Sequence, residues 1–126
     1  MRHYFAAVPI MFNQPVDSAR ELLARYNSGE RVFKGASLNG VNLQGACLKS
    51  ISLVQAHLVK ANLRGADLYE AHLEQADLRD ADLEGAYLVG SHLEGADLEG
   101  ANLKDANLDG TIFDGSIVPN GRVRWQ

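Results

Sequence analysis

Residues 61–110 read ANLRG ADLYE AHLEQ ADLRD ADLEG AYLVG SHLEG ADLEG ANLKD ANLDG, with leucine at every fifth position. The spacing continues without a break from Leu38 to Leu108, fifteen leucines in all. In an α-helix five residues advance about 140° around the axis, so these leucines would scatter over every side. In a flat strand an odd spacing would leave half of them in water. The leucines share one interior only if the chain bends once per repeat, so the sequence predicts a solenoid.

The other positions of the repeat support the same interpretation. Two residues before the leucine, alanine occurs in twelve of fifteen repeats, as a tightly packed inside corner requires. The residue immediately before the leucine is mostly polar and is expected to face outward. Two residues after the leucine, ten of the seventeen sites from Gly35 to Gly115 are glycine, which tolerates the backbone angles of a turn.

The A-(D/N)-L-x-x pattern resembles the pentapeptide repeat family, over about two thirds of the chain. The resemblance implies an all-β solenoid, a right-handed quadrilateral β-helix in which four repeats make one coil of twenty residues. The seventeen repeats in 31–115 would then form about four coils. A strand-like spacing of ~4.8 Å per coil makes the rod only about 20 Å tall.

The residues flanking the repeats suggest a cap at each end. Residues 1–30 are expected to form an N-terminal extension and a short capping α-helix, since Ser18 and Glu21 have capping-box spacing and Gly29 supplies a stop. Residues 116–126 keep few features of the repeat and are expected to form an extended segment or hairpin, with Trp125 partly covering the last coil.

Length and composition predict one small cytoplasmic domain. The chain has 126 residues and a single cysteine, Cys47, to which we assign no role. The apolar start from Phe5 to Phe12 contains Pro9 and lacks the pattern of a signal peptide, and it is too short to span a bilayer. We therefore expect no membrane association.

Catalytic, cofactor and metal sites are not expected. The repeats show no nucleophile motif and no phosphate-binding loop, and the predicted core is leucine and alanine. Under the twenty-residue coil, His72 and His92 would share one face beside Glu74, Glu94 and Asp114. Imidazoles and carboxylates can bind a divalent transition metal, but a flat wall offers few ligand directions, so a solvated ladder is the preferred interpretation.

Charge is distributed unevenly along the repeats. Residues 31–65 carry five cations and no acid, whereas residues 66–115 carry thirteen acids and two cations. The overall net charge of −4 conceals this polarity. Such a distribution is either ordinary solvation of an outer wall or a surface that selects a partner by electrostatic complementarity.

The function we favour is a non-enzymatic rigid rod that binds an unknown protein partner. The candidate surface comprises two kinds of outward side chain, acidic and apolar: Glu74, Glu94, Glu99, Asp114, Tyr69, Tyr87 and Val89. The alternative is an acidic rod that mimics DNA and binds an enzyme such as a type II topoisomerase. Its acidic stretch is short and its basic end opposes that function, so no direct nucleic-acid contact is expected. A homodimer through a coil end or the N-terminal apolar segment is a further alternative.

Overall fold

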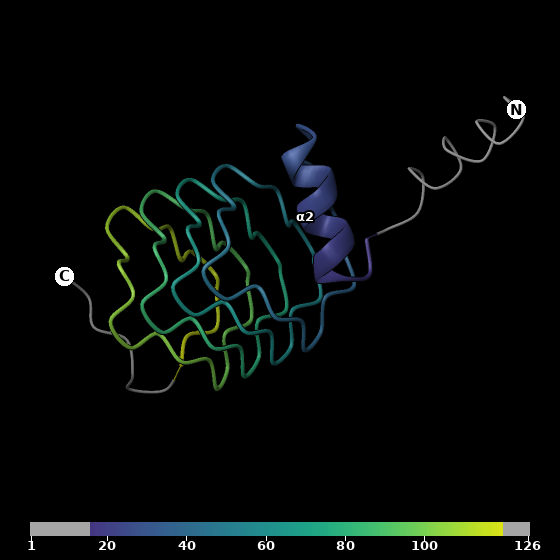
Figure 1. Ribbon diagram of the computed structural model, residues 1–126. Coiled ribbons are helices and arrows are strands. Elements are labelled where there is room, and N and C mark those ends of the chain that lie inside the picture. Colours follow the sequence, from purple (N-terminus) through teal and green to yellow (C-terminus); the bar gives the residue numbers. More distant parts are fainter. Residues whose placement is uncertain (1–15, 120–126) are drawn as a thin grey trace, which may run out of the picture.

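The structure, a computed structural model, describes residues 16–119 and is a stack of coils with a helix across the first coil (Figure 1). The helix is α2, Ala19–Asn27, and within the described range the coils are held by isolated parallel β-bridges rather than by longer strands. Every bridge joins residues twenty positions apart, such as His72 with His92 and Asp77 with Asp97. One coil therefore takes four pentapeptides, as the resemblance implied.

The bridged residues form four columns, which define four walls. Wall A carries Val32, Ser52, His72, His92 and Ile112. Wall B carries Ser37, His57, Asp77, Asp97 and Ile117. Wall C carries Asn42, Asn62, Asp82 and Asn102. Wall D carries Cys47, Asp67, Tyr87 and Asn107. Each wall also includes the residue two positions further along every repeat, just after the leucine.

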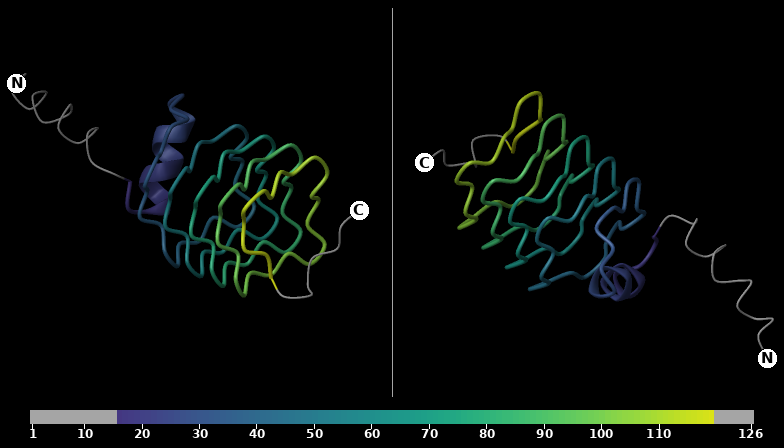
Figure 2. Two further views of the ribbon diagram at one scale, coloured as in Figure 1. Left: turned by 180° about the vertical axis from the view of Figure 1, so that it is seen from behind. Right: turned by 90° about the horizontal axis from the view of Figure 1, so that it is seen from above.

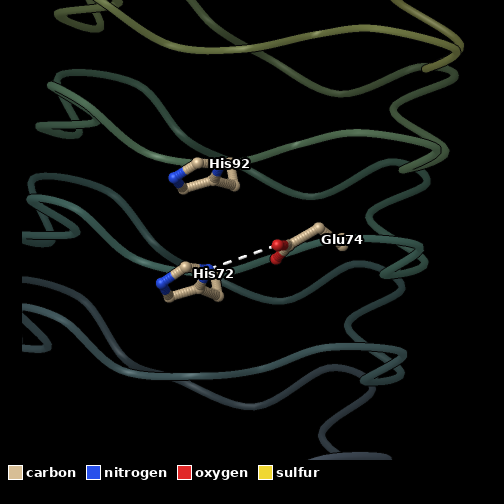
Figure 3. A group of neighbouring side chains, drawn as sticks. All are labelled: His72, Glu74 and His92. Carbon is tan, nitrogen blue, oxygen red and sulfur yellow. Dashed lines mark hydrogen bonds and ion pairs between the residues drawn. The ribbon is translucent and has the colours of Figure 1, made fainter.

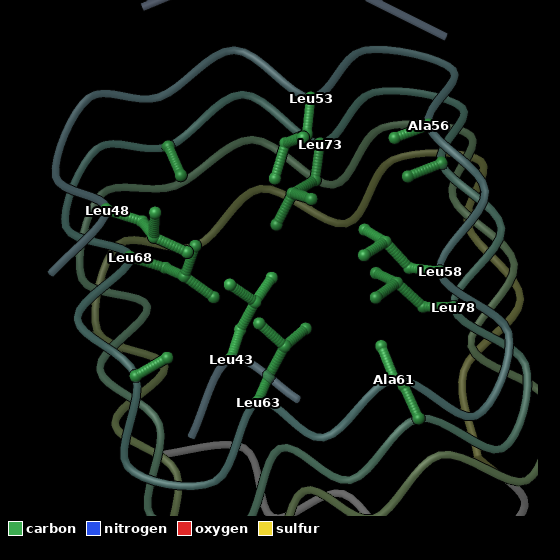
Figure 4. Packing of buried hydrophobic residues seen from close by; sticks show 14 of the residues in the cluster. Leu43, Leu48, Leu53, Ala56, Leu58, Ala61, Leu63, Leu68, Leu73 and Leu78 are labelled. Atoms are coloured by element: carbon green, nitrogen blue, oxygen red, sulfur yellow. The ribbon is translucent and has the colours of Figure 1, made fainter. Parts of the chain in front are cut away.

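The core of the rod is the column of leucines and alanines that the spacing predicted (Figure 4). The leucines from Leu38 to Leu98 are 0–1 % exposed, and Leu103 is 6 % exposed. Leu108, the fifteenth, is only partly buried, as expected near the last coil. Leucines from successive coils stack along the axis, so each coil buries its apolar surface against its neighbours.

The preference for Asp or Asn before the leucine has a specific cause. The ladder between coils uses the N–H groups of this residue and of the leucine, but not the N–H group of the residue after the leucine. Asn62 Oδ1 accepts the N–H of Arg64 at 3.1 Å, and Asp82 Oδ1 accepts that of Glu84 at 3.1 Å. A short carboxylate or amide side chain therefore accepts a hydrogen bond from the backbone N–H group that the ladder between coils does not use.

The corners of the coils adopt left-handed backbone angles. Ten of the repeats from Gly35 onward have glycine there, and seven have another residue at a φ of 54° to 60°: Ser50, Gln55, Lys60, Glu70, Gln75, Asp80 and Asp105. At Gly100 a Cβ atom would meet the Asp80 carboxylate of the coil below, so a larger residue there would displace the Asp80 side chain. The turn geometry predicted for the fifth position is confirmed.

Helix α2 covers the first coil, as its amphipathic pattern predicted (Figure 2). Ser18 Oγ accepts the N–H of Glu21 at 3.1 Å, whereas the Glu21 carboxylate contacts Arg25 instead of completing the capping box. Leu22 is fully buried, and Tyr26 Oη donates to the carbonyl oxygen of Lys49 at 2.8 Å. The helix is thus anchored to the open edge of wall D.

The segment before α2 covers the open edge of the first coil on wall B. The N–H of Ser37 donates to the carbonyl oxygen of Val16 at 2.8 Å, in the pattern that joins successive coils elsewhere on wall B. At the far end, Ile117 is 54 % exposed and Phe113 is partly buried. The apolar segment from Phe5 to Phe12 and the tail with Trp125 lie outside the described residues.

Candidate functional site

Wall D presents an exposed aromatic pair. Tyr69 and Tyr87 are 37 % and 41 % exposed, and their rings stack with centroids 6.2 Å apart. The N–H of Leu68 donates to the carbonyl oxygen of Tyr87 at 2.8 Å, and that of Glu70 donates to the carbonyl oxygen of Val89 at 2.9 Å. These backbone hydrogen bonds hold the two coils side by side. Tyr69, Tyr87 and Val89 therefore form one patch, which we call the tyrosine patch. The predicted clustering of these residues on one wall agrees with this geometry.

The tyrosine patch has a charged rim. Lys49 Nζ lies 3.7 Å from Asp67 Oδ2 beside it, and Glu70 and Asp109 are exposed on the same side of the rod. Aromatic rings with one apolar face and one polar end are enriched at protein interfaces. The patch therefore combines exposed aromatic area with charged side chains at its rim.

Wall A presents a second cluster, which we call the His–Glu ladder: His72, Glu74, His92 and Glu94. The two imidazole rings stack almost parallel, with centroids 4.7 Å apart and an interplanar angle of 5°. Each ring nitrogen Nδ1 faces the glutamate of its own repeat, at 3.2 Å for His72 to Glu74 and 3.3 Å for His92 to Glu94. The repeat places both side chains outward because they flank a buried leucine.

The ladder is half-buried, and its carboxylates are incompletely satisfied. The side chains of His72 and His92 are 45 % and 33 % exposed. Glu74 Oε1 and Glu94 Oε1 are both buried without a hydrogen-bond partner. Within the described residues, ligand atoms of His72, Glu74 and His92 lie within 4.8 Å of one another (Figure 3). The sequence predicted this placement of the histidines, but not the two buried oxygens.

The seven candidate surface residues do not share one face. The tyrosine patch lies on wall D, and Glu74 and Glu94 belong to the His–Glu ladder on wall A. Asp114 lies one rung beyond the ladder and is exposed, while its repeat bears Ile112 in place of a histidine. Glu99 is exposed on wall B. A single flat partner cannot contact all seven at once.

Wall C joins the basic and acidic parts of the rod. Arg64 Nη1 donates to Asp82 Oδ2 at 3.0 Å and to Glu84 Oε1 at 2.8 Å in the coil above. Asn102 donates from the coil beyond to Asp82 Oδ1 and Glu84 Oε1, at 3.1 and 3.3 Å. Burial tends to raise the pKa of Asp82, but hydrogen bonds donated by Arg64, by the backbone N–H of Glu84 and by Asn102 lower the pKa below its usual value. Part of the charge polarity is thus neutralised between coils.

The architecture defines the class of protein: a β-solenoid built from five-residue repeats, four to a coil. The chain belongs to the pentapeptide repeat family, whose fold is the right-handed quadrilateral β-helix. The family model described as "Pentapeptide repeats" matches this chain in eight copies, over residues 32–53, 50–85 and 76–115. A comparison with curated proteins finds no match.

Three solved structures illustrate the likeness. The pentapeptide repeat protein Rfr23 of the cyanobacterium Cyanothece 51142 is 39 % identical with a TM-score of 0.70, over 75 % of this chain and 64 % of that one. The protein alr5209 of Nostoc PCC 7120 is 37 % identical with a TM-score of 0.64, over 86 % and 91 %. HetL of Nostoc sp. strain PCC 7120, a pentapeptide repeat protein involved in heterocyst differentiation regulation, is 30 % identical with a TM-score of 0.55, over 71 % and 48 %.

The matched structures differ in how much of their own length this chain covers. The chain spans 64 % of the Rfr23 chain and about half of the HetL chain, whereas it spans nearly all of alr5209. Over residues 16–119, no helix has the length and apolar character needed to cross a membrane.

Proposed function

We propose that this protein is a non-enzymatic, cytoplasmic interaction module, a rigid rod that binds a protein partner through the tyrosine patch. The observation that carries the proposal is the stacked, exposed pair of Tyr69 and Tyr87 on a wall whose backbone is held by hydrogen bonds to both neighbouring coils. A rigid aromatic surface loses little conformational entropy on binding, so its buried area contributes efficiently to affinity.

The rim of the patch indicates the chemistry of the partner. Glu70 and Asp109 are exposed beside the tyrosines, and the acidic repeats continue onto wall A. Arginine or lysine side chains on a partner would gain both carboxylate contacts and contacts with the tyrosine rings. We therefore expect a partner with an apolar centre and a basic rim. The regulatory involvement of HetL is consistent with a binding role, since regulation proceeds through binding events.

Binding assays with matched variants test this proposal. In the patch variant, Tyr87→Asn and Tyr69→Gln introduce residues that already occur at equivalent positions, Asn107 and Gln44. The control variant carries His57→Asn and Val59→Gln, which remove a ring and an apolar side chain from the same positions of wall B. Affinity capture from native extract should recover a partner with the wild type and the control.

The patch variant should bind that partner at least about tenfold more weakly in a purified titration, because aromatic anchors at interfaces are commonly worth 2 kcal/mol or more. Equal affinity of the patch variant and the wild type would contradict the proposal. Sedimentation of the wild type alone tests the alternative partner, a second copy of the chain. Dimers lost in the patch variant would replace the unknown partner with self-association.

DNA mimicry remains the alternative, and the excess of acid over residues 66–115 is the observation that favours it. Duplex DNA carries one charge per ~1.7 Å, so a decoy needs a long, uniformly acidic face. Here Arg64 and Arg79 interrupt the acids and pair with them. We expect no inhibition of type II topoisomerase supercoiling at micromolar protein. Salt-sensitive inhibition, abolished by changing Glu74, Glu94 and Glu99 to lysine, would establish mimicry instead.

A further inference from the structure

We infer that the His–Glu ladder on wall A is a binding site for one divalent transition metal ion, of which Zn²⁺ fits the donor set best. The site would take imidazole nitrogens from His72 and His92 and a carboxylate oxygen from Glu74, whose ligand atoms lie within 4.8 Å of one another. Glu94 lies outside this group but contacts His92, and it would supply the fourth ligand. His72, Glu74 and His92 point outward from two adjacent coils (Figure 3), and Glu94 contacts His92 in the second of these coils. A metal site on this wall differs from the expectation from sequence, which was a column of solvated side chains without a metal ion.

The donor types select the class of ion. Imidazole with carboxylate suits zinc and its neighbours in the first transition series, whereas calcium and magnesium take ligand sets made of oxygen. Four protein ligands also match the coordination number of zinc in its closed sites. The ladder supplies this number from two repeats of the same motif, His-Leu-Glu, one coil apart.

The spacing of the ligand atoms suits one ion. Zinc bonds of about 2.0–2.2 Å in a tetrahedron place neighbouring ligand atoms about 3.3–3.6 Å apart. The distance from Nδ1 to Oε2 is already 3.2 Å in one rung and 3.3 Å in the other. Between rungs the rings are 4.7 Å apart, and they must tilt toward each other to share an ion. Both are partly exposed, at 45 % and 33 %, so solvent leaves room for this rotation.

The unsatisfied oxygens are an independent observation that points to a cation. Glu74 Oε1 and Glu94 Oε1 are buried without a hydrogen-bond partner, and a buried carboxylate oxygen without one is costly. On wall C, the equivalent glutamate, Glu84, receives hydrogen bonds from Arg64 and Asn102. On wall A, the described structure shows only a histidine beside each glutamate. A metal ion would supply the positive charge that arginine supplies on wall C.

The geometry also explains why the other walls offer no equivalent. His57 on wall B lies between Ser37 and Asp77 in its column, with no second histidine one coil away. The ladder itself ends above His92 at Ile112 and below His72 at Ser52. The site therefore exists only where two His-Leu-Glu repeats are stacked, and its ion would join the two coils to each other. Metal binding should accordingly raise the melting temperature.

Titration of the purified full chain with Zn²⁺ alone, by calorimetry and by equilibrium dialysis, tests the inference. The variants are His92→Asn and Glu94→Gln, with His57→Asn as the control that removes a histidine from the neighbouring wall. Asparagine already stands at this position of the repeat in Asn62 and Asn102, so the substitution is compatible with the coil. Circular dichroism verifies that each variant keeps the wild-type fold.

The wild type and His57→Asn should each bind one zinc ion per chain, and both should melt at a higher temperature with zinc. Loss of a group that merely supports a metal ligand weakens binding about 10–100-fold, so removal of a ligand should weaken it at least tenfold. His92→Asn and Glu94→Gln should both show this loss. Unchanged zinc affinity in His92→Asn overturns the inference. So does a wild type that binds no zinc, or an equal loss in His57→Asn.

Discussion

Wall A and wall C are built on the same backbone, yet their outward side chains differ in how completely they are paired. On wall C, Arg64 and Asn102 reach from two coils to the same carboxylates, Asp82 and Glu84. On wall A, Glu74 and Glu94 each contact one histidine and leave one oxygen buried without a partner. The core determines which side chains face outward, whereas the side chains of the same repeat and of the coils above and below determine their partners.

The difference teaches where a repeat protein can carry function. A column whose charges are satisfied between coils contributes to the rod and offers little to a ligand. A column with unsatisfied donors or acceptors has binding capacity left, and so does the exposed pair of tyrosines on wall D. The following experiments test whether the walls are equal in their cores and unequal only in their outward side chains.

The largest effect should come from the shared core. Leu73 on the inner side of wall A and Leu83 on the inner side of wall C are 0 % and 1 % exposed. An unpaired carboxylate at such a site costs several kcal/mol against a total stability of about 5–15 kcal/mol, so Leu73→Asp and Leu83→Asp should both unfold the rod. Circular dichroism and thermal melts measure this directly. The control Glu74→Ala should still melt cooperatively, and equal stability of Leu73→Asp and Glu74→Ala would refute the inward assignment.

The next effect should distinguish wall C. Arg64→Met removes the guanidinium that bridges Asp82 and Glu84 and leaves two neighbouring carboxylates unscreened, so the melting temperature should fall by a few degrees. The matched control is Lys104→Met, the same loss of charge in the same column at a side chain for which the described structure shows no ion pair. The difference between the two variants should shrink at high salt. Equal melting temperatures would mean that the wall C network is not stabilising.

Acid should weaken two ion pairs, Arg79 with Asp77 on wall B and Arg64 with Asp82 on wall C. The hydrogen bond from Arg79 lowers the pKa of Asp77, and Arg64 with its neighbours lowers the pKa of Asp82. These carboxyls contribute stability that is fully present above their unfolded pKa, about 3.9, and is lost as pH falls through their lower folded pKa. The melting temperature should therefore decrease as the pH is lowered below about 4. The double variant Asp77→Asn/Asp82→Asn should show a smaller decrease, and an unchanged pH profile would contradict this account.

The smallest effect should come from wall A without metal. In His92→Asn, the new amide occupies the position from which Asn102 donates to Glu84, so it can donate to Glu74 in the same way. The free energy of unfolding should change by no more than about 0.5 kcal/mol, as for most surface substitutions. Urea unfolding in the presence of a chelator measures it. A large loss of stability would show that the stacked imidazoles hold the coils together on their own.

Much of the fold was predictable because the signal is repeated. The leucine period indicates the inward column, and Ser18 indicates the start of the cap helix; both predictions are confirmed, although the Glu21 carboxylate contacts Arg25 and does not complete the capping box. The role of Asp and Asn before the leucine was missed, although the signal is present: those residue types have a short acceptor that reaches the N–H two residues on.

Contacts between coils were harder to predict because they depend on side-chain rotamers. The placement of His72 beside His92 follows from the period of twenty, and the structure has it. The rotamers that turn each glutamate toward its own histidine, and bury one oxygen, do not follow from spacing. The bridge from Arg64 to the coil above was likewise missed, although basic and acidic residues eighteen and twenty positions apart are its signature.

The corner at every fifth residue has a consequence for how such a gene can change. Deletion of one pentapeptide, for example residues 76–80, would leave the leucine period intact and remove only a quarter of a coil. Every later residue would nevertheless move back to the preceding wall, and His92 would fall above Asp67 on wall D rather than above His72 on wall A. The fold thus tolerates length changes in steps of five, whereas any site formed between coils survives only steps of twenty.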